Sequence, residues 1–134
     1  MSDRVFFDSN VLIYAMVSGD SRRERAQQLV EQGGTISVQV LNEFVSVARR
    51  KMRMPWEDVI EAMDAIRVLF PSPVPITLDT HEAALKIAQQ YGFHIYDALI
   101  AAAALEAKCY TLYSEDLQDG QVIDKELTIR NPFG

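Results

Sequence analysis

The sequence predicts an α/β fold with a central, mainly parallel sheet of about five short strands. The apolar run Val5-Phe6-Phe7 is typical of a strand that is buried on both faces in an α/β domain. Further short apolar runs alternate with longer segments of helical periodicity, which favours parallel strands joined by right-handed helical crossovers. We expect the strands at residues 5–7, 35–37, 76–78, 110–113 and 127–129.

Capping and turn residues delimit the helices between these strands. The first helix is expected at residues 11–17. Ser21 is expected to cap a second helix at 22–31, which Gly33 and Gly34 end. Broad apolar periodicity predicts a third helix at 39–52.

Prolines mark the boundaries of the next segments. Pro55 stands where a first helical residue would be and predicts a helix that runs to about residue 70. Three further prolines, at 71, 73 and 75, predict an extended connection to the strand at 76–78. Asp79 and Thr80 offer caps for the following helix, and Gly92 is expected to close it. The last helix, at 95–105, is apolar nearly all round and should be deeply buried.

Length and composition limit the classes of protein to consider. The 134 residues fit one domain spanning 1–134, and 49% hydrophobic with 24% charged residues is ordinary for a globular chain. We find neither a signal-peptide pattern nor an apolar stretch of about 18 residues, so a cytoplasmic protein without a membrane partner is expected. The single cysteine, Cys109, excludes an internal disulfide. A net charge of −6 argues mildly against broad electrostatic binding of nucleic acid.

Asp8 is the first candidate functional residue, because it follows the first strand at the sheet edge where α/β folds bind ligands. Capping of the next helix is the alternative role. Glu43 lies on or beside the buried stripe of its helix, where a carboxylate needs a pairing group, a proton or a cation. A salt bridge at the edge of that stripe would also explain it.

Asp97 and Asp116 occupy comparable places. Asp97 stands at the start of the last helix, where the helix dipole stabilises negative charge, although this position taken alone favours an N-cap role. Asp116 follows the fourth expected strand as Asp8 follows the first, and turn chemistry alone would explain both Asp116 and Asp119. We assign no role to His94.

Four carboxylates on one sheet edge would repel one another unless a proton or a hard cation intervened. In a parallel sheet the ends of strands and the starts of helices share one edge, so these acids should converge there. An all-oxygen set without Cys or His ligands suits Mg²⁺ or Mn²⁺.

Four motifs in order resemble those of PIN-domain ribonucleases, and in particular the VapC-like toxins of toxin–antitoxin pairs. They are Asp8-Ser9-Asn10-Val11-Leu12, Asn42-Glu43-Phe44, Tyr96-Asp97-Ala98-Leu99-Ile100-Ala101-Ala102-Ala103 and Ser114-Glu115-Asp116-Leu117. The resemblance implies a three-layer α/β/α fold, a Mg²⁺ or Mn²⁺ site, cleavage of single-stranded RNA, a homodimer and a cognate antitoxin.

The resemblance also assigns roles to particular residues. It makes Asp8, Glu43, Asp97 and Asp116 both the catalytic acids and the metal ligands, with Ser9, Asn10 and Ser114 as supporting polar residues. Candidates for holding the RNA backbone are the clustered arginines Arg22, Arg23, Arg49, Arg50 and Arg53.

Other classes fit the residues less well. A haloacid-dehalogenase-type phosphatase would carry Asp-x-Asp where this chain has Asn10, and a receiver-like phosphorylation domain would place a lysine at a late strand end, which neither Lys108 nor Lys125 does. The remaining alternative is a PIN-fold binding module without catalysis, acting through protein or RNA contacts.

Overall fold

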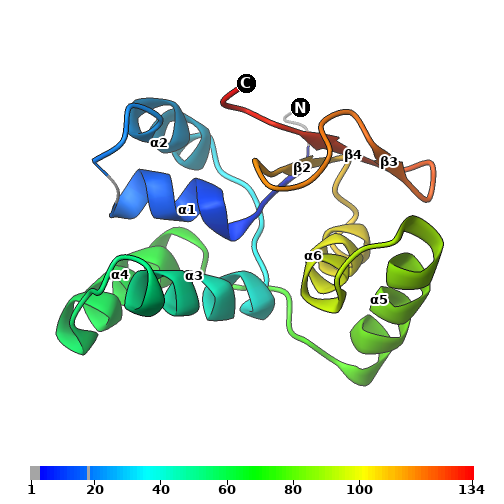
Figure 1. Cartoon of the computed structure of the whole chain (residues 1–134), viewed down its shortest axis with the longest axis horizontal. Helices are drawn as coiled ribbons and strands as arrows, with labels where there is room; N and C mark the ends of the chain where they lie inside the picture. The colour runs from blue at the N-terminus through cyan, green and yellow to red at the C-terminus, as the bar shows by residue number, and fades with distance from the viewer. Residues whose placement is uncertain (1–3, 18) are drawn as a thin grey trace.

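The computed structural model describes residues 4–17 and 19–134, so residues 1–3 of the expected domain and residue 18 lie outside the described part. Ten elements follow one another along these described residues (Figure 1). They are β1 (Val5–Phe7), α1 (Ser9–Met16), α2 (Arg23–Glu31), α3 (Val38–Arg50), α4 (Trp56–Leu69), α5 (Leu78–Tyr91), α6 (Ile95–Glu106), β2 (Thr111–Tyr113), β3 (Val122–Ile123) and β4 (Leu127–Arg130).

The described residues form a four-stranded sheet in the order β1-β2-β4-β3. β1 pairs with β2 and β2 pairs with β4, both in parallel, whereas β3 runs antiparallel to β4. Phe6 and Phe7 are both fully buried. Because neighbouring strand residues point to opposite faces, the sheet is covered on both sides. The predicted α/β/α class and the mainly parallel sheet are therefore confirmed, with four strands where about five were expected.

The helices pack in pairs around the sheet. α1 packs against α2 and α3, α3 also packs against α4 and α6, and α5 packs along α6. α6 is the most deeply buried helix, since every residue from Ala98 to Ala104 is buried, as its all-round apolar character predicted. Its run of small alanines lets the neighbouring backbones approach closely.

Two predicted strands differ from the structure for reasons of hydrogen bonding. Segment 35–37 makes only isolated parallel bridges, Phe6 with Thr35 and Ser37 with Val74. The prediction of a strand at 76–78 is wrong, because Thr77 caps α5. The residue that forms a parallel bridge with Ser37 is Val74. Val74 lies between two prolines, which lack the N–H groups needed to extend a ladder.

β3 was not expected from the sequence, because the turn after it carries no glycine. Asp124 and Lys125 make this turn with φ values of 51° and 61°. Non-glycine residues enter this left-handed region uncommonly, so the local sequence gives no hairpin signal.

Helix starts were predicted less well than helix interiors. α2 begins after Arg22, whose backbone N–H is bound by the Asp20 carboxylate, so the predicted Ser21 cap is wrong. Thr77 caps α5 in a reciprocal pair with Thr80. Gly92 closes α5 with φ 75°, as predicted.

A candidate acidic active site

Asp8 lies at the carboxyl end of β1 and is only 3% exposed. Its Oδ1 accepts a hydrogen bond from the Ser9 backbone N–H at 2.7 Å, so Asp8 does cap α1. Its Oδ2 accepts a second bond, also 2.7 Å, from the hydroxyl of Ser114 at the end of β2. The carboxylate therefore joins the ends of two neighbouring strands, which capping alone does not require.

Ser114 is fully buried and organises the loop that carries Asp116. Its Oγ donates to Asp8 and accepts from the backbone N–H groups of Asp116 and Leu117, both at 3.3 Å. Since the two amides occupy its acceptor positions, the hydroxyl proton is directed at Asp8. This one side chain fixes the loop 114–117 relative to β1.

Glu43 reaches the same edge from α3. Its Oε1 accepts a hydrogen bond from the Ser9 hydroxyl at 3.2 Å, and its Oε2 accepts one from the Gln39 amide at 3.3 Å. Ser9 therefore links the two acids as a donor to both. Its backbone N–H donates to Asp8, and its hydroxyl donates to Glu43.

Asp116 and Asp97 complete the group of acids. Asn10 donates from Nδ2 to Asp116 Oδ2 at 3.3 Å, while its Oδ1 accepts from the Glu115 backbone N–H. Asp97 is the third residue of α6 and half-buried. The N-cap position belongs to His94, whose Nδ1 accepts from the Tyr96 N–H, so Asp97 is not the cap. Asp119, in contrast, binds the backbone N–H of Asn131 and takes part in a turn.

The electrostatics show that the acids act on one another. Burial raises the pKa of Asp8 from 3.8 to about 7; the Ser114 and Ser9 hydrogen bonds oppose this, and the charges of Glu43 and Asp116 add to it. Burial also raises the pKa of Glu43, with further contributions from Asp97 and Asp116. The pKa of Asp97 is raised by burial first and then by Asp116, against the lowering effect of His94. Ionisation of Asp8, Glu43 and Asp97 is thus disfavoured, by burial first and by the neighbouring acids as well.

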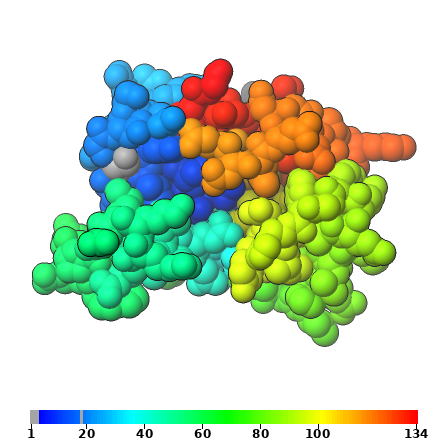
Figure 2. All heavy atoms as spheres, in the orientation of Figure 1, coloured from blue at the N-terminus to red at the C-terminus, as the bar shows by residue number. Residues whose placement is uncertain are grey.

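The donor chemistry of this edge fits a hard divalent cation, because the groups are carboxylate, hydroxyl and amide oxygens. Repulsion among buried carboxylates is also what such a cation relieves. Within 4–17 and 19–134, however, no three Asp, Glu, His or Cys side chains are drawn together closely enough to form a ready group of metal ligands. Figure 2 shows the first residues of α3 and α6 next to α1 (blue) and the loop that follows β2 (orange), near the middle of one face.

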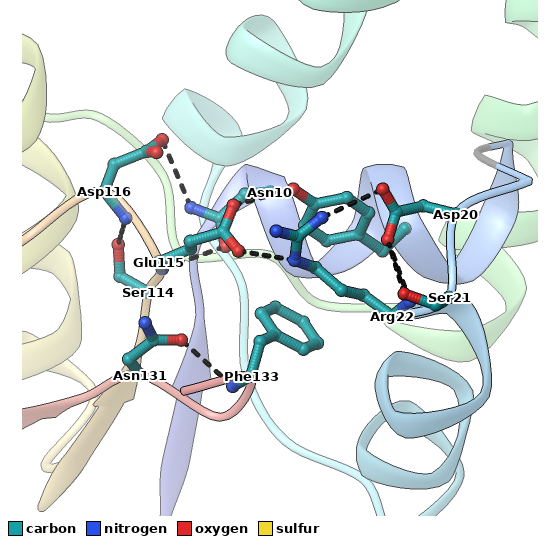
Figure 3. Close-up of polar contacts among 10 residues, drawn as sticks. Asn10, Asp20, Ser21, Arg22, Ser114, Glu115, Asp116, Asn131 and Phe133 are labelled. Atoms are coloured by element: carbon teal, nitrogen blue, oxygen red, sulfur yellow. Dashed lines mark hydrogen bonds and ion pairs between the residues drawn. The ribbon is translucent and has the colours of Figure 1, made fainter.

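A second polar network lies beside the acids (Figure 3). Tyr14 donates its hydroxyl to Glu115 Oε1 at 2.6 Å, and Arg22 Nε pairs with Glu115 Oε2 at 2.9 Å. Arg22 also pairs with Asp20 at 2.9 Å and lies over the Tyr14 ring at 5.1 Å. Burial, followed by the hydrogen bond and charge of Glu115, raises the pKa of Tyr14 to about 12. The network ties the loop 114–117 to α1 and to the start of α2.

The arginines do not share one environment. Arg22 is engaged with Glu115 and Asp20. Arg49 donates to the Met54 carbonyl and lies over the Trp56 ring at 4.5 Å. Arg50 is exposed at the last residue of α3, about 10 Å along the helix axis from Glu43. Arg23 and Arg53 are exposed, on α2 and after α3.

Sequence reasoning gave no role to Gln39, Tyr14 or Glu115. Gln39 precedes Glu43 by four residues on one helix, so helical spacing alone would have placed the two side chains together. The Tyr14 to Glu115 bond spans 101 residues and carries no comparable local signal.

Solved structures of other proteins share the fold of this chain over most of their length. A toxin–antitoxin complex from Klebsiella pneumoniae gives a TM-score of 0.72 at 24% identity, covering 96% of this chain and 98% of that one. VapC20 of Mycobacterium tuberculosis, described as a sarcin-ricin loop cleaving toxin, gives 0.65 at 22% identity with 84% and 89% coverage. VapBC2 of Rickettsia felis, bound to a DNA fragment from its promoter, gives 0.66 at 18% identity with 95% and 97% coverage.

At these identities the likeness establishes the fold. No curated protein matches the sequence significantly. In the part of the chain that the structure describes, no helix is long and apolar enough to cross a membrane. The family model of the PIN domain matches residues 5–118, which includes all four acids and their supporting residues. The chain therefore belongs to the PIN domain family.

Proposed function

We propose that this chain is a metal-dependent endoribonuclease that hydrolyses RNA phosphodiester bonds and serves as the toxin of a toxin–antitoxin pair. The observation that carries the proposal is the placement of the acids at the carboxyl edge of the sheet, where Ser114, Ser9 and Asn10 hold the carboxylates of Asp8, Glu43 and Asp116 by hydrogen bonds. Burial, together with the charges of Glu43 and Asp116, raises the pKa of Asp8 to about 7. A site that brings acidic groups together in this way is suited to a cation.

In this proposal Asp8, Glu43, Asp97 and Asp116 hold Mg²⁺ or Mn²⁺. The bound cation would lower the pKa of a water molecule and offset charge on the phosphate and leaving oxygen. Ser9 and Ser114 keep the carboxylates of Glu43 and Asp8 oriented through the hydrogen bonds described above. Asn10 does the same for Asp116.

The arginines remain candidates for the RNA backbone, and their environments rank them. Exposed Arg50 and Arg53 are placed to reach a phosphate from solvent, and Arg23 stays a candidate at an exposed position on α2. Arg22 would have to share its guanidinium with Glu115 and Asp20. Phosphate contacts of this kind make binding salt-dependent.

The proposed partners follow from the comparison proteins. Two of the similar structures are described as a toxin–antitoxin complex and as VapBC2, which supports a cognate antitoxin for this chain. We further propose a homodimer, a single domain over residues 1–134 and a cytoplasmic location. The continuous cluster of buried apolar residues supports the single domain.

A non-catalytic PIN-fold binding module is the alternative function. It would use the same fold for protein or RNA contacts and would need no cation. The presence of all four acids, together with polar residues that orient three of them, favours catalysis over this alternative.

The test is an RNA cleavage assay with a matched pair of variants. Purified protein, freed of any partner, is incubated with structured and single-stranded RNAs in EDTA and then with Mg²⁺ or Mn²⁺. Asp97→Asn should abolish cleavage while circular dichroism shows an intact fold. Asp64→Asn, which changes an exposed acid on α4, should cleave like the wild type.

Mn²⁺ binding separates the two functions if no RNA is cut. Calorimetry should show binding to the wild type and to Asp64→Asn but weakened binding to Asp97→Asn. At a Mn²⁺ concentration of about 100 times Kd, unfolding of the wild type should become harder by about 2.7 kcal/mol. Metal-independent cleavage, or undiminished cleavage by Asp97→Asn, would contradict the metal-site proposal.

A further inference from the structure

A hollow of about 290 Å³ lies directly beside Glu43. Gln39, Asn42, Glu43 and Ser46 line it from α3, and Tyr96 lines it from the first turn of α6. The two helices pack against each other, and Figure 1 shows their first turns side by side. Glu43 therefore forms both a wall of this hollow and a part of the acidic site.

The residues that line the hollow all carry polar groups and, apart from Glu43, are uncharged. The α3 residues recur at spacings of three and four, so they form one face of the helix. Gln39 is engaged with Glu43. Asn42 and Ser46 are exposed, and their side chains make no hydrogen bond to the described part of the chain. They consequently offer donors and acceptors to an incoming group.

Tyr96 adds an exposed aromatic surface to these polar groups. It is 56% exposed although it precedes the half-buried Asp97. The His94 ring supports it, with ring centroids 5.1 Å apart and an interplanar angle of 45°. A supported, solvent-facing ring beside free amide and hydroxyl groups is how proteins bind the face and edge of an unpaired base.

Other ligand chemistries fit this lining less well. A phosphate would find no positively charged side chain here, since none of the lining residues is basic. An apolar side chain would leave Asn42 and Ser46 without partners. A flat, uncharged, hydrogen-bonding group satisfies both requirements.

We propose that this hollow holds one unpaired nucleobase of the RNA substrate, next to the phosphate that is cut. Tyr96 stacks on the base, and Asn42 forms hydrogen bonds with its edge. The proposal rests on the proposed function, because the position of the base is defined by the acidic site. Its consequence is that the chain distinguishes RNA sequences at one position adjoining the cleavage site.

The test compares the cleavage of short single-stranded RNAs that differ at one position at a time. Tyr96→Ala, Tyr96→Phe and Asn42→Ala are measured beside the wild type. The control is Tyr110→Ala, because Tyr110 is a comparably exposed tyrosine, 62% exposed, that does not line the hollow. Affinity for the same RNAs is measured with each substitution in the Asp97→Asn background, so that cleavage does not interfere.

Tyr96→Ala should weaken RNA affinity about tenfold, since stacking of a base on an aromatic ring is of this size. It should also reduce the base preference at one position, while Tyr96→Phe keeps both properties. Asn42→Ala should change which base is preferred, and Tyr110→Ala should change neither property.

Two different failures can be distinguished. If Tyr96→Ala and Asn42→Ala cleave RNA as the wild type does, with the same affinity and base preference, the proposed base site is overturned. The proposed nuclease function then still stands. An equal loss in Tyr96→Ala and Tyr110→Ala would also overturn it, because a non-specific surface effect would then suffice. A wild type that neither cuts nor binds any RNA would overturn the proposed function and the base site with it.

Discussion

Replacing Asp8 by Asn should make the metal-free protein more stable at alkaline pH. The pKa of Asp8 is 3.8 in an exposed carboxyl and about 7 in the folded chain. Each pH unit between the two values corresponds to about 1.4 kcal/mol. Ionised Asp8 therefore lowers the free energy of unfolding by about 4 kcal/mol above pH 7.

The sign follows from proton binding. Between the two pKa values the folded protein holds more protons at Asp8 than the unfolded chain does, so its stability falls as the pH rises through this window. The side-chain oxygen of Asn can still accept from the Ser9 N–H, but its NH₂ group takes the place of the oxygen that accepts from the Ser114 hydroxyl. Loss of that hydrogen bond costs about 1 kcal/mol of stability. The net gain for Asp8→Asn should be about 3 kcal/mol at pH 8 and below about 1 kcal/mol at pH 5.

Urea unfolding in EDTA at both pH values measures this difference. Asp64→Asn, a change of the same kind at an exposed site, should alter stability by less than about 0.5 kcal/mol at either pH. A loss of stability in Asp8→Asn that is the same at pH 5 and pH 8 would refute the reasoning, because it would mean that the ionised carboxylate is favourable in the fold.

Three further changes test other parts of the structure. Glu115→Gln removes the charge that pairs with an arginine and should slow RNA cleavage roughly tenfold through a looser loop 114–117, with less than about 1 kcal/mol lost in urea unfolding. Gly34→Ala places a Cβ 2.5 Å from the Phe7 ring and should cost about 1 to 3 kcal/mol, whereas Gly19→Ala, with nothing within 4 Å, should be neutral. Arg50→Ala should reduce the slope of log affinity against log salt by about 0.7 if one phosphate contact is lost; an unchanged slope would remove Arg50 from the RNA surface.

The first strand, and the convergence of the ends of β1 and β2 at one edge of the sheet, were predictable from the sequence. Val5-Phe6-Phe7 is apolar at every position, and a parallel topology then brings the residues after β1 and β2 to one edge. The hydrogen bond between Ser114 and Asp8 shows this convergence directly. Roles for the acids as ligands stay predictions, which the variants above test.

Features that depend on distant partners or unusual backbone were not predictable. A strand was expected at 76–78, but the residue that pairs with Ser37 is Val74. The prolines on both sides of Val74 limit this pairing to one bridge. The hairpin before β4 turns on Asp124 and Lys125, whose positive φ values no local rule suggests. Arg22 stays a candidate for the RNA backbone, but its pairing with Glu115 was not predictable because it depends on tertiary structure.

The order of the strands bears on how the acidic edge forms during folding. Asp8 follows β1, but its partner Ser114 follows β2, which lies between β1 and β4 in the sheet. The two side chains are 106 residues apart in the sequence, so the edge forms only after a long-range pairing that is slow to find. In the proposed nuclease, a partly folded chain without this pairing would have no complete acidic site.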